Sequence, residues 1–256
     1  MDAILSVDSL FSGYGELPVL HDITLDVGRG EIVSVVGANG AGKTTLFNCI
    51  SRLYHYSEGS ITFDGRALEN QPRHRMAGLG LGRTFQNLAL FNSLSVRDNI
   101  LVGRHAPTRK GFFANALRLP GVAAEERASA RRADELVNFL GLGSVANTRV
   151  ADLPFGTQKR VELGRALAGD PSLLLLDEPA AGLNHEEVGA LAGLIRDIRD
   201  SFKLTVLLVE HHVGLVRQVS DQVVVLDFGR KIADGPPDEV RRHPDVIQAY
   251  LGTEDA

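Results

Sequence analysis

The chain has 256 residues and a mass of 27.6 kDa, with 44% hydrophobic and 23% charged residues, which is enough to bury one large core or two small ones. Its net charge of −5 and pI near 5.9 argue against a dedicated nucleic-acid-binding protein. The single cysteine excludes an internal disulfide framework, and the apolar runs are far shorter than the ~18 residues of a membrane-spanning helix. The first ten residues lack a basic start and a cleavage-site pattern, so we expect no secretory signal.

The N-terminal third alternates short strand candidates with glycine-rich turns. β-Branched and aliphatic runs bounded by Gly, Asp or Pro predict strands over residues 4–7, 23–27, 32–36 and 60–63. A helix is predicted to open at Lys43, because Leu46 and Ile50 can share one of its faces.

The middle of the chain, from residue 88 to 153, has a mainly helical pattern. An apolar stripe marks its strongest helix, and Gly141 is expected to end that helix. The stripe consists of Leu136, Val137, Phe139 and Leu140. We therefore expect a helical subdomain over residues 88–160, inserted into a core formed by residues 1–87 and 161–256.

After residue 153 helices and strands alternate again. The patterns predict helices over 156–168, 185–200 and 213–219, and strands over 173–177, 204–209 and 223–227. These strands are continuously apolar, as in a mainly parallel sheet that is covered on both faces. Residues 228–230 form a turn into a short edge strand. The sequence therefore predicts an α/β fold.

A phosphate-binding loop is predicted over residues 37–44, which match G-x-x-x-x-G-K-[ST] between a strand and a helix. A nucleoside triphosphate carries about four negative charges. The backbone N–H groups of such a loop and the N-terminus of the following helix can bind its phosphates. The Lys43 ammonium would lie between the β- and γ-phosphates, and the Thr44 hydroxyl could ligate Mg²⁺. The predicted ATP-binding residues here are Gly37, Asn39, Gly40, Gly42, Lys43, Thr44 and Thr45.

Residues 173–178, LLLLDE, form a buried strand that ends in two acids. Acids at the carboxyl end of a parallel strand lie where such sheets bind ligands. Asp177 is predicted to hold Mg²⁺, directly or through water. Glu178 is predicted to orient and polarise the attacking water, since phosphoryl transfer depends mainly on positioning and charge stabilisation.

Over nearly its whole length the chain resembles the ATP-binding subunit of an ABC transporter. Gln86 in RTFQN resembles the Q-loop glutamine, which implies contact with Mg²⁺ and the membrane subunit, and His211 matches the H-loop histidine at the γ-phosphate. Tyr14 matches the aromatic residue that stacks on adenine. Residues 153–160 stand at the family signature, whose Gly156 and Gln158 would reach the nucleotide of a second subunit. The implied fold is a P-loop NTPase core of the ABC type, in which a mainly parallel sheet is joined by an N-terminal antiparallel β-subdomain and an inserted helical subdomain.

The signature departs from the family's Leu-Ser-Gly-Gly-Gln at three positions, namely Pro154, Phe155 and Thr157. Proline removes a hydroxyl and a backbone N–H, but Gly156 and the following helix N-terminus still offer donors. Asn184 stands where the family has the D-loop aspartate. With an acid three residues later it also fits a helix N-cap, so a structural and a functional role both stay open.

Several stretches resemble the ATPases of branched-chain amino-acid importers: the LP-aromatic-G signature, LDEPAAGLN, RTFQNLALF, NILVGRH, the insert at 108–132 and VVVLDFGRKIADG. The resemblance implies an ATP- and Mg²⁺-dependent motor on the cytoplasmic face of the inner or plasma membrane. Its implied partners are two integral membrane permeases, a second ATP-binding subunit that is identical or paralogous, and an extracytoplasmic solute-binding protein.

Four other functions remain open from the sequence. The ATPase could serve a urea or amide importer or a lipopolysaccharide exporter. A soluble ABC ATPase of repair or translation is disfavoured, because such proteins usually carry two ATPase units or a long coiled coil. A non-hydrolysing nucleotide-binding module is disfavoured because the residues expected for hydrolysis are all present.

Overall fold

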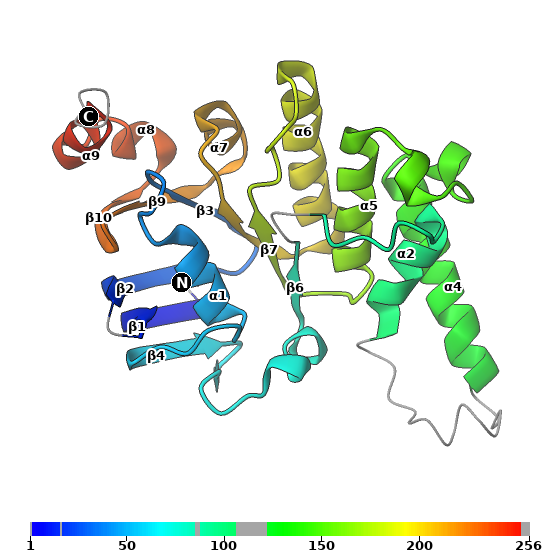
Figure 1. The fold of residues 1–256 in the computed structure, drawn as a ribbon, viewed down its shortest axis with the longest axis horizontal. Helices are drawn as coiled ribbons and strands as arrows, with labels where there is room; N and C mark the ends of the chain where they lie inside the picture. Colours follow the sequence, from blue (N-terminus) through cyan, green and yellow to red (C-terminus); the bar gives the residue numbers. More distant parts are fainter. Residues whose placement is uncertain (1, 16, 85–87, 106–121, 252–256) are drawn as a thin grey trace. The chain divides into compact units, whose positions relative to one another are not determined.

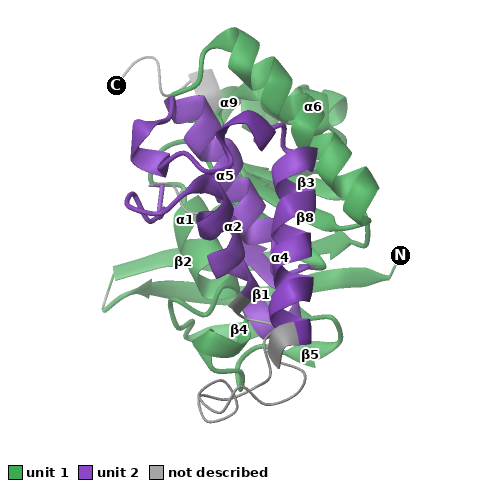
Figure 2. Ribbon diagram, turned by 90° about the vertical axis from the view of Figure 1, so that its right-hand side faces the viewer, with its two compact units in different colours: residues 1–76, 172–256 green, residues 77–171 purple. Residues whose placement is uncertain are grey.

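The computed structural model describes residues 2–15, 17–84, 88–105 and 122–251. Two compact units make up the chain, residues 1–76 with 172–256 and residues 77–171 (Figure 2). The sequence pattern predicts a helical insert over residues 88–160. The second compact unit covers residues 77–171 and therefore extends beyond that range at both ends. Helix α5 (Phe155–Leu167) falls wholly inside this unit, because it packs on two other helices of the same unit.

The first unit contains an antiparallel sheet with the strand order β2-β1-β4-β5. Its strands are β1 (Ala3–Tyr14), β2 (Leu17–Gly28), β4 (Glu58–Phe63) and β5 (Arg66–Ala67). Strands β1 and β2 pair from Ala3↔Gly28 to Tyr14↔Leu17 through several register shifts. They are longer than the predicted runs at 4–7 and 23–27, because each shift interrupts the alternation of buried and exposed residues from which a strand is recognised.

The second sheet of this unit has the order β10-β9-β3-β8-β7, in which the last four strands are parallel and β10 is antiparallel to β9. The strands are β3 (Ile32–Val36), β7 (Leu173–Asp177), β8 (Thr205–Val209), β9 (Gln222–Asp227) and β10 (Arg230–Gly235). Every residue of β7 and β8 is buried, as their continuous apolar character predicts. The expected fold, with a mainly parallel sheet and an N-terminal antiparallel sheet, is confirmed.

The described residues of the first unit form the α-helices α1 (Lys43–Ile50), α6 (His185–Phe202), α7 (Val213–Val219), α8 (Pro237–Val240) and α9 (Pro244–Leu251), with the short 3₁₀ helix η1 (Arg73–Arg75). Helix α1 packs against β1, β2 and β7, and α8 packs against α7, β9 and β10. In Figure 1 the two C-terminal helices lie beside β10. No helix in the described part of the chain combines the length and apolar character that crossing a bilayer requires.

The second unit is mainly helical. It contains β6 (Leu81–Arg83), α2 (Val96–Val102), α4 (Val122–Phe139), α5 and the 3₁₀ helices η2 (Ala77–Leu79), η3 (Gly103–His105), η4 (Gly143–Val145) and η5 (Val150–Asp152). Helix α2 packs against both α4 and α5. Gly141, at φ +65°, follows the end of α4, and the Leu142 N–H donates to the Val137 carbonyl at 2.8 Å. The predicted glycine stop is thus present as a left-handed cap.

Candidate nucleotide site

Parallel strand pairing brings the predicted site segments of the first unit to one sheet edge. Val209 of β8 stands opposite Val35 of β3 and Asp177 of β7. The phosphate loop follows β3, the turn with His211 follows β8, and of the two acids Asp177 ends β7 and Glu178 comes directly after it. They therefore meet at the carboxyl edge, where open α/β sheets bind ligands.

The phosphate loop has the conformation that its glycines permit. Gly37, Gly40 and Gly42 have φ angles of 154°, 83° and 98°. A Cβ atom at Gly37 would lie 2.2 Å from the backbone oxygen of Leu226, so no larger residue fits there. No side chain caps the N-terminus of α1, which leaves its dipole and first N–H groups suited to an anion.

Lys43 is held inside this loop. Its side chain is buried, and Nζ donates to the carbonyl oxygens of Gly37 at 2.7 Å and Ala38 at 2.9 Å. Burial lowers the pKa of Lys43, whereas the negative charges of Glu178 and Asp177 act to raise it. The ammonium group therefore shares one electrostatic site with both acids.

The two acids differ in their surroundings. Asp177 is buried, whereas the Glu178 side chain is 15% exposed. Glu178 has φ +46°, a left-handed conformation that is uncommon for a non-glycine residue, and its N–H donates to the Val209 carbonyl at 2.9 Å. Its Oε1 lies 3.9 Å from Nδ1 of His211, whose side chain is 58% exposed. Two residues predicted to act on the γ-phosphate and the attacking water are thus neighbours.

Glu210 is a site residue that the sequence analysis did not identify. It is fully buried between strand β8 and His211. Its Oε1 accepts a hydrogen bond from the Ala180 N–H at 2.8 Å, and its Oε2 accepts from the N–H groups of His211 and His212 at 2.9 and 3.0 Å. One carboxylate therefore joins the turn after β7 to the turn after β8. The available signal was an acid at the end of an apolar strand, the same signal that identified Asp177.

The remaining candidates of the first unit lie close to the loop. Thr44 is exposed and Thr45 is buried on α1. The Tyr14 hydroxyl lies 3.4 Å from Oγ1 of Thr45, and the half-exposed Tyr14 ring packs edge-on against Tyr54 at 5.3 Å between centroids. Tyr14 therefore stands beside the phosphate-loop helix with part of its ring accessible.

The other candidates lie elsewhere in the chain. Gln86 is outside the described residues. Gly156 and Gln158 belong to the second unit, in the first turn of α5, whose N-cap is Pro154 without a side-chain cap. Nε2 of Gln158 donates to the Leu153 carbonyl at 2.9 Å, so this amide serves its own helix start.

The donors at the carboxyl edge suit a hard cation. The Thr44 hydroxyl and the Asp177 carboxylate supply oxygen, the ligand that Mg²⁺ prefers. Among the described residues no group of three or more His, Cys, Asp or Glu side chains could hold a metal ion. A magnesium ion that also takes oxygens from nucleotide phosphates needs only one or two protein carboxylates.

Comparison with known proteins identifies the family. A family described as "ABC transporter" matches residues 20–181, and one described as "Branched-chain amino acid ATP-binding cassette transporter" matches residues 230–256. The high-affinity branched-chain amino acid transport ATP-binding protein LivG of Salmonella typhimurium is 39% identical over 249 residues, covering 97% of this chain and 98% of LivG. The chain belongs to the ATP-binding proteins of ABC transporters. The resemblance to the branched-chain amino-acid type is confirmed.

Solved structures agree with this assignment. The ADP conformation of an ATP-binding cassette of an ABC transporter matches this ABC ATPase with a TM-score of 0.85 and 26% identity, over 98% of this chain and 100% of that one. CbiO1 from Clostridium perfringens, described as part of the ABC transporter complex cbiONQ, matches with a TM-score of 0.82 and 30% identity, over 97% and 94% of the two chains. The protein is an ATP-hydrolysing subunit of an ABC transporter complex.

Proposed function

We propose that this ABC ATPase is the motor subunit of an importer for branched-chain amino acids. The observation that carries the motor role is the meeting of Lys43, Asp177, Glu178 and His211 at one sheet edge. The cargo is proposed from the printed function of LivG and from the C-terminal match over residues 230–256. The partners are two integral membrane permeases and, through them, an extracytoplasmic solute-binding protein. The ATPase would lie on the cytoplasmic face of the inner or plasma membrane.

Each residue at the edge has a distinct role in this proposal. The loop amides and Lys43 bind the triphosphate, and Tyr14 stacks on adenine. Thr44, Asp177 and Gln86 would hold Mg²⁺, which would neutralise phosphate charge. Glu178 orients the attacking water. His211, whose Nδ1 lies 3.9 Å from Oε1 of Glu178, contacts the γ-phosphate.

A second ATP-binding subunit, identical or paralogous, completes the site head to tail. Gly156 and the uncapped N-terminus of α5 would face the γ-phosphate bound to the other subunit. ATP would close this interface and hydrolysis would open it. The permeases convert closure and opening into alternating access.

Two substitutions test the catalytic assignment. Glu178→Gln keeps the shape of the side chain but not its charge, so it should retain ATP binding and slow hydrolysis by about 100-fold or more. Lys43→Ala, in contrast, should weaken ATP binding. Both are measured as ATP binding and steady-state ATPase activity of the complex assembled with its permeases. Normal turnover in Glu178→Gln would contradict the role of Glu178, and unchanged ATP affinity and uptake in Lys43→Ala would contradict the whole site.

The cargo needs a separate measurement. Proteoliposomes that contain the complex and its solute-binding protein should take up labelled leucine, isoleucine or valine in an ATP-dependent manner. Uptake of urea or an amide instead would contradict the cargo and leave the motor role standing.

A further inference from the structure

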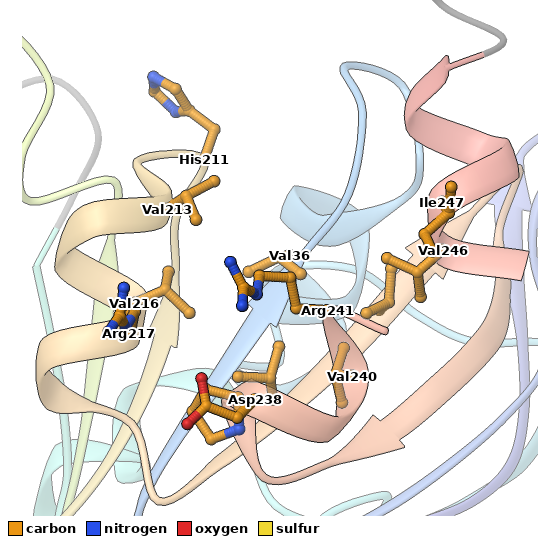
Figure 3. A pocket seen from close by; sticks show the side chains of 13 residues that line it. Val36, His211, Val213, Val216, Arg217, Asp238, Val240, Arg241, Val246 and Ile247 are labelled. Atoms are coloured by element: carbon orange, nitrogen blue, oxygen red, sulfur yellow. The ribbon is translucent and has the colours of Figure 1, made fainter. Parts of the chain in front are cut away.

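A cavity of the first unit lies between α7 and the C-terminal helices α8 and α9 (Figure 3). Its volume is about 350 Å³, near the lower end of the ~300–1,000 Å³ typical of small-molecule sites. Aliphatic side chains form most of its wall, namely Val36, Val213, Val216, Val240, Val246 and Ile247. We call it the valine pocket. Its walls suit a small branched aliphatic group.

Three charged side chains also line the valine pocket: Arg217 from α7, and Asp238 and Arg241 from α8 and its C-cap. Arg241 extends from α8 into the space between α7 and α8 (Figure 3). Within the described part of the chain, none of the three side chains has a hydrogen-bond or ion-pair partner. Other arginines of this unit, such as Arg199, pair with aspartates. Two guanidinium groups and one carboxylate therefore remain available beside the aliphatic wall.

The aliphatic wall and the three charged side chains together indicate which class of ligand the valine pocket can bind. A guanidinium group recognises a carboxylate, with two parallel hydrogen bonds in the best geometry, and Asp238 can receive an ammonium group. The aliphatic wall offers no hydrogen-bond donor or acceptor to a sugar or a base. We propose that the valine pocket binds a free aliphatic α-amino acid, such as leucine or valine, on the ATPase itself.

The position of the pocket connects it to the ATP site. Val36 directly precedes Gly37, the first residue of the phosphate loop, and His211 lies at the rim with its imidazole directed away from the valines (Figure 3). A ligand that bridges α7 and α8 would therefore restrain the turn that carries His211. The occupant is inferred from the chemistry of the pocket and does not rest on the proposed cargo.

Isothermal titration calorimetry of the purified full chain tests the ligand class. L-Leucine should bind. 4-Methylpentanoate lacks the ammonium group and 3-methylbutylamine lacks the carboxylate, so each should bind about 10-fold or more weakly, since each loses one charge-assisted contact. Glycine, which lacks the aliphatic group, should give no detectable binding. No binding of leucine, or binding of 4-methylpentanoate as tight as that of leucine, overturns the proposal.

Matched variants locate the binding site. Arg241→Glu should weaken leucine binding about 10-fold or more, because it replaces an attraction by a repulsion. Arg242→Glu makes the same charge change at the next residue, which is exposed and does not line the pocket, so it should change the affinity by less than about 2-fold. Ile247→Asp, at a residue that is 45% exposed, should weaken leucine binding without opening the core. Equal losses in Arg241→Glu and Arg242→Glu overturn the placement.

The proposed cargo and the proposed ligand of the valine pocket can be contradicted independently of each other. A transporter that carries another solute, while its ATPase still binds leucine, would contradict the cargo and support the valine pocket. Leucine uptake by the complex, with no leucine binding by the isolated chain, would overturn the valine pocket alone.

Discussion

The buried carboxylate of Glu210 joins two turns of the candidate nucleotide site. A buried ionised group is tolerated only where hydrogen bonds replace its lost hydration, and three backbone N–H groups do so here. These donors come from Ala180, after the strand that carries the two acids, and from His211 and His212. Glu210 is therefore a positioning residue for the His211 turn.

Glu210→Gln should disturb this position while keeping the size of the side chain. The amide replaces one acceptor oxygen by an NH₂ donor, which would face a backbone N–H. We expect kcat for ATP hydrolysis to fall about 10-fold or more with little change in the KM for ATP, because the phosphate loop is untouched. Steady-state ATPase assays of the assembled complex measure both constants.

Two further observations separate positioning from folding in this experiment. Glu239→Gln, at an exposed residue of α8, is the control and should leave kcat unchanged. A Glu210→Gln protein that unfolds more easily but keeps the wild-type kcat per folded molecule would show that Glu210 serves stability alone.

At the scale of residues, sequence spacing was sufficient to predict the strand ends at which the candidate phosphate-binding groups lie. The string at 37–44 predicts the loop, and an acid after an apolar strand predicts Asp177. Glu210 shows the same pattern, but its role depends on its carboxylate reaching the Ala180 N–H, a residue 30 positions away. That contact follows from the pairing of β7 with β8, which no local pattern encodes.

Helix α6 begins with a complete capping box. The Asn184 side chain accepts a hydrogen bond from the Glu187 N–H at 3.0 Å, and Oε2 of Glu187 accepts from the Asn184 N–H at 2.9 Å. Two N–H groups that the helix cannot satisfy are thereby bonded. The structural role left open for Asn184 by the sequence is thus present.

Asn184→Ala should lower the free energy of unfolding by about 1 kcal/mol, the usual cost of losing such a cap. Asn184→Asp keeps an acceptor at the same place and should leave the stability nearly unchanged, which makes it the matched control. Urea denaturation of the purified chain followed by circular dichroism gives both values. Equal stability of wild type and Asn184→Ala would contradict the structural role.

The elements themselves were predictable to different degrees. The buried strands β7 and β8 lie within two residues of their predicted ranges, because uninterrupted apolar runs between polar turns leave little ambiguity. The β1–β2 hairpin was underestimated, because its bulges and polar positions such as Ser9, at φ +47°, break the alternation.

At the scale of the whole molecule, the extent of the helical unit depends on contacts that are distant in sequence. Patterning marks where helices replace strands, near residues 88 and 160. Asp170 forms ion pairs with Arg104 and Arg132, which joins the segment after α5 to the earlier helices of the same unit. A change of local pattern cannot reveal such a connection.

The proposed head-to-tail arrangement predicts a variant that separates ATP binding from hydrolysis. Gly156→Asp places a carboxylate in the first turn of α5, where the helix dipole favours an anion and where no acidic residue now stands, so the helix should remain folded. The same carboxylate would repel the phosphates of the other subunit's nucleotide. We expect unchanged ATP affinity of the isolated chain and a loss of about 100-fold or more in the ATPase activity of the assembled complex.

Gly189→Asp on α6 is the control for this variant, because a Cβ atom at Gly189 would have no neighbour within 4 Å beyond its own helix backbone, and the residue lies outside the proposed site. Circular dichroism should show the same helix content in both variants. The decisive comparison is between ATP binding by the isolated chain and ATP hydrolysis by the assembled complex. If Gly156→Asp weakens ATP binding by the isolated chain as strongly as it slows hydrolysis, Gly156 acts on the nucleotide of its own subunit. If hydrolysis in the complex is unaffected, the N-terminus of α5 does not complete the ATP site of its neighbour.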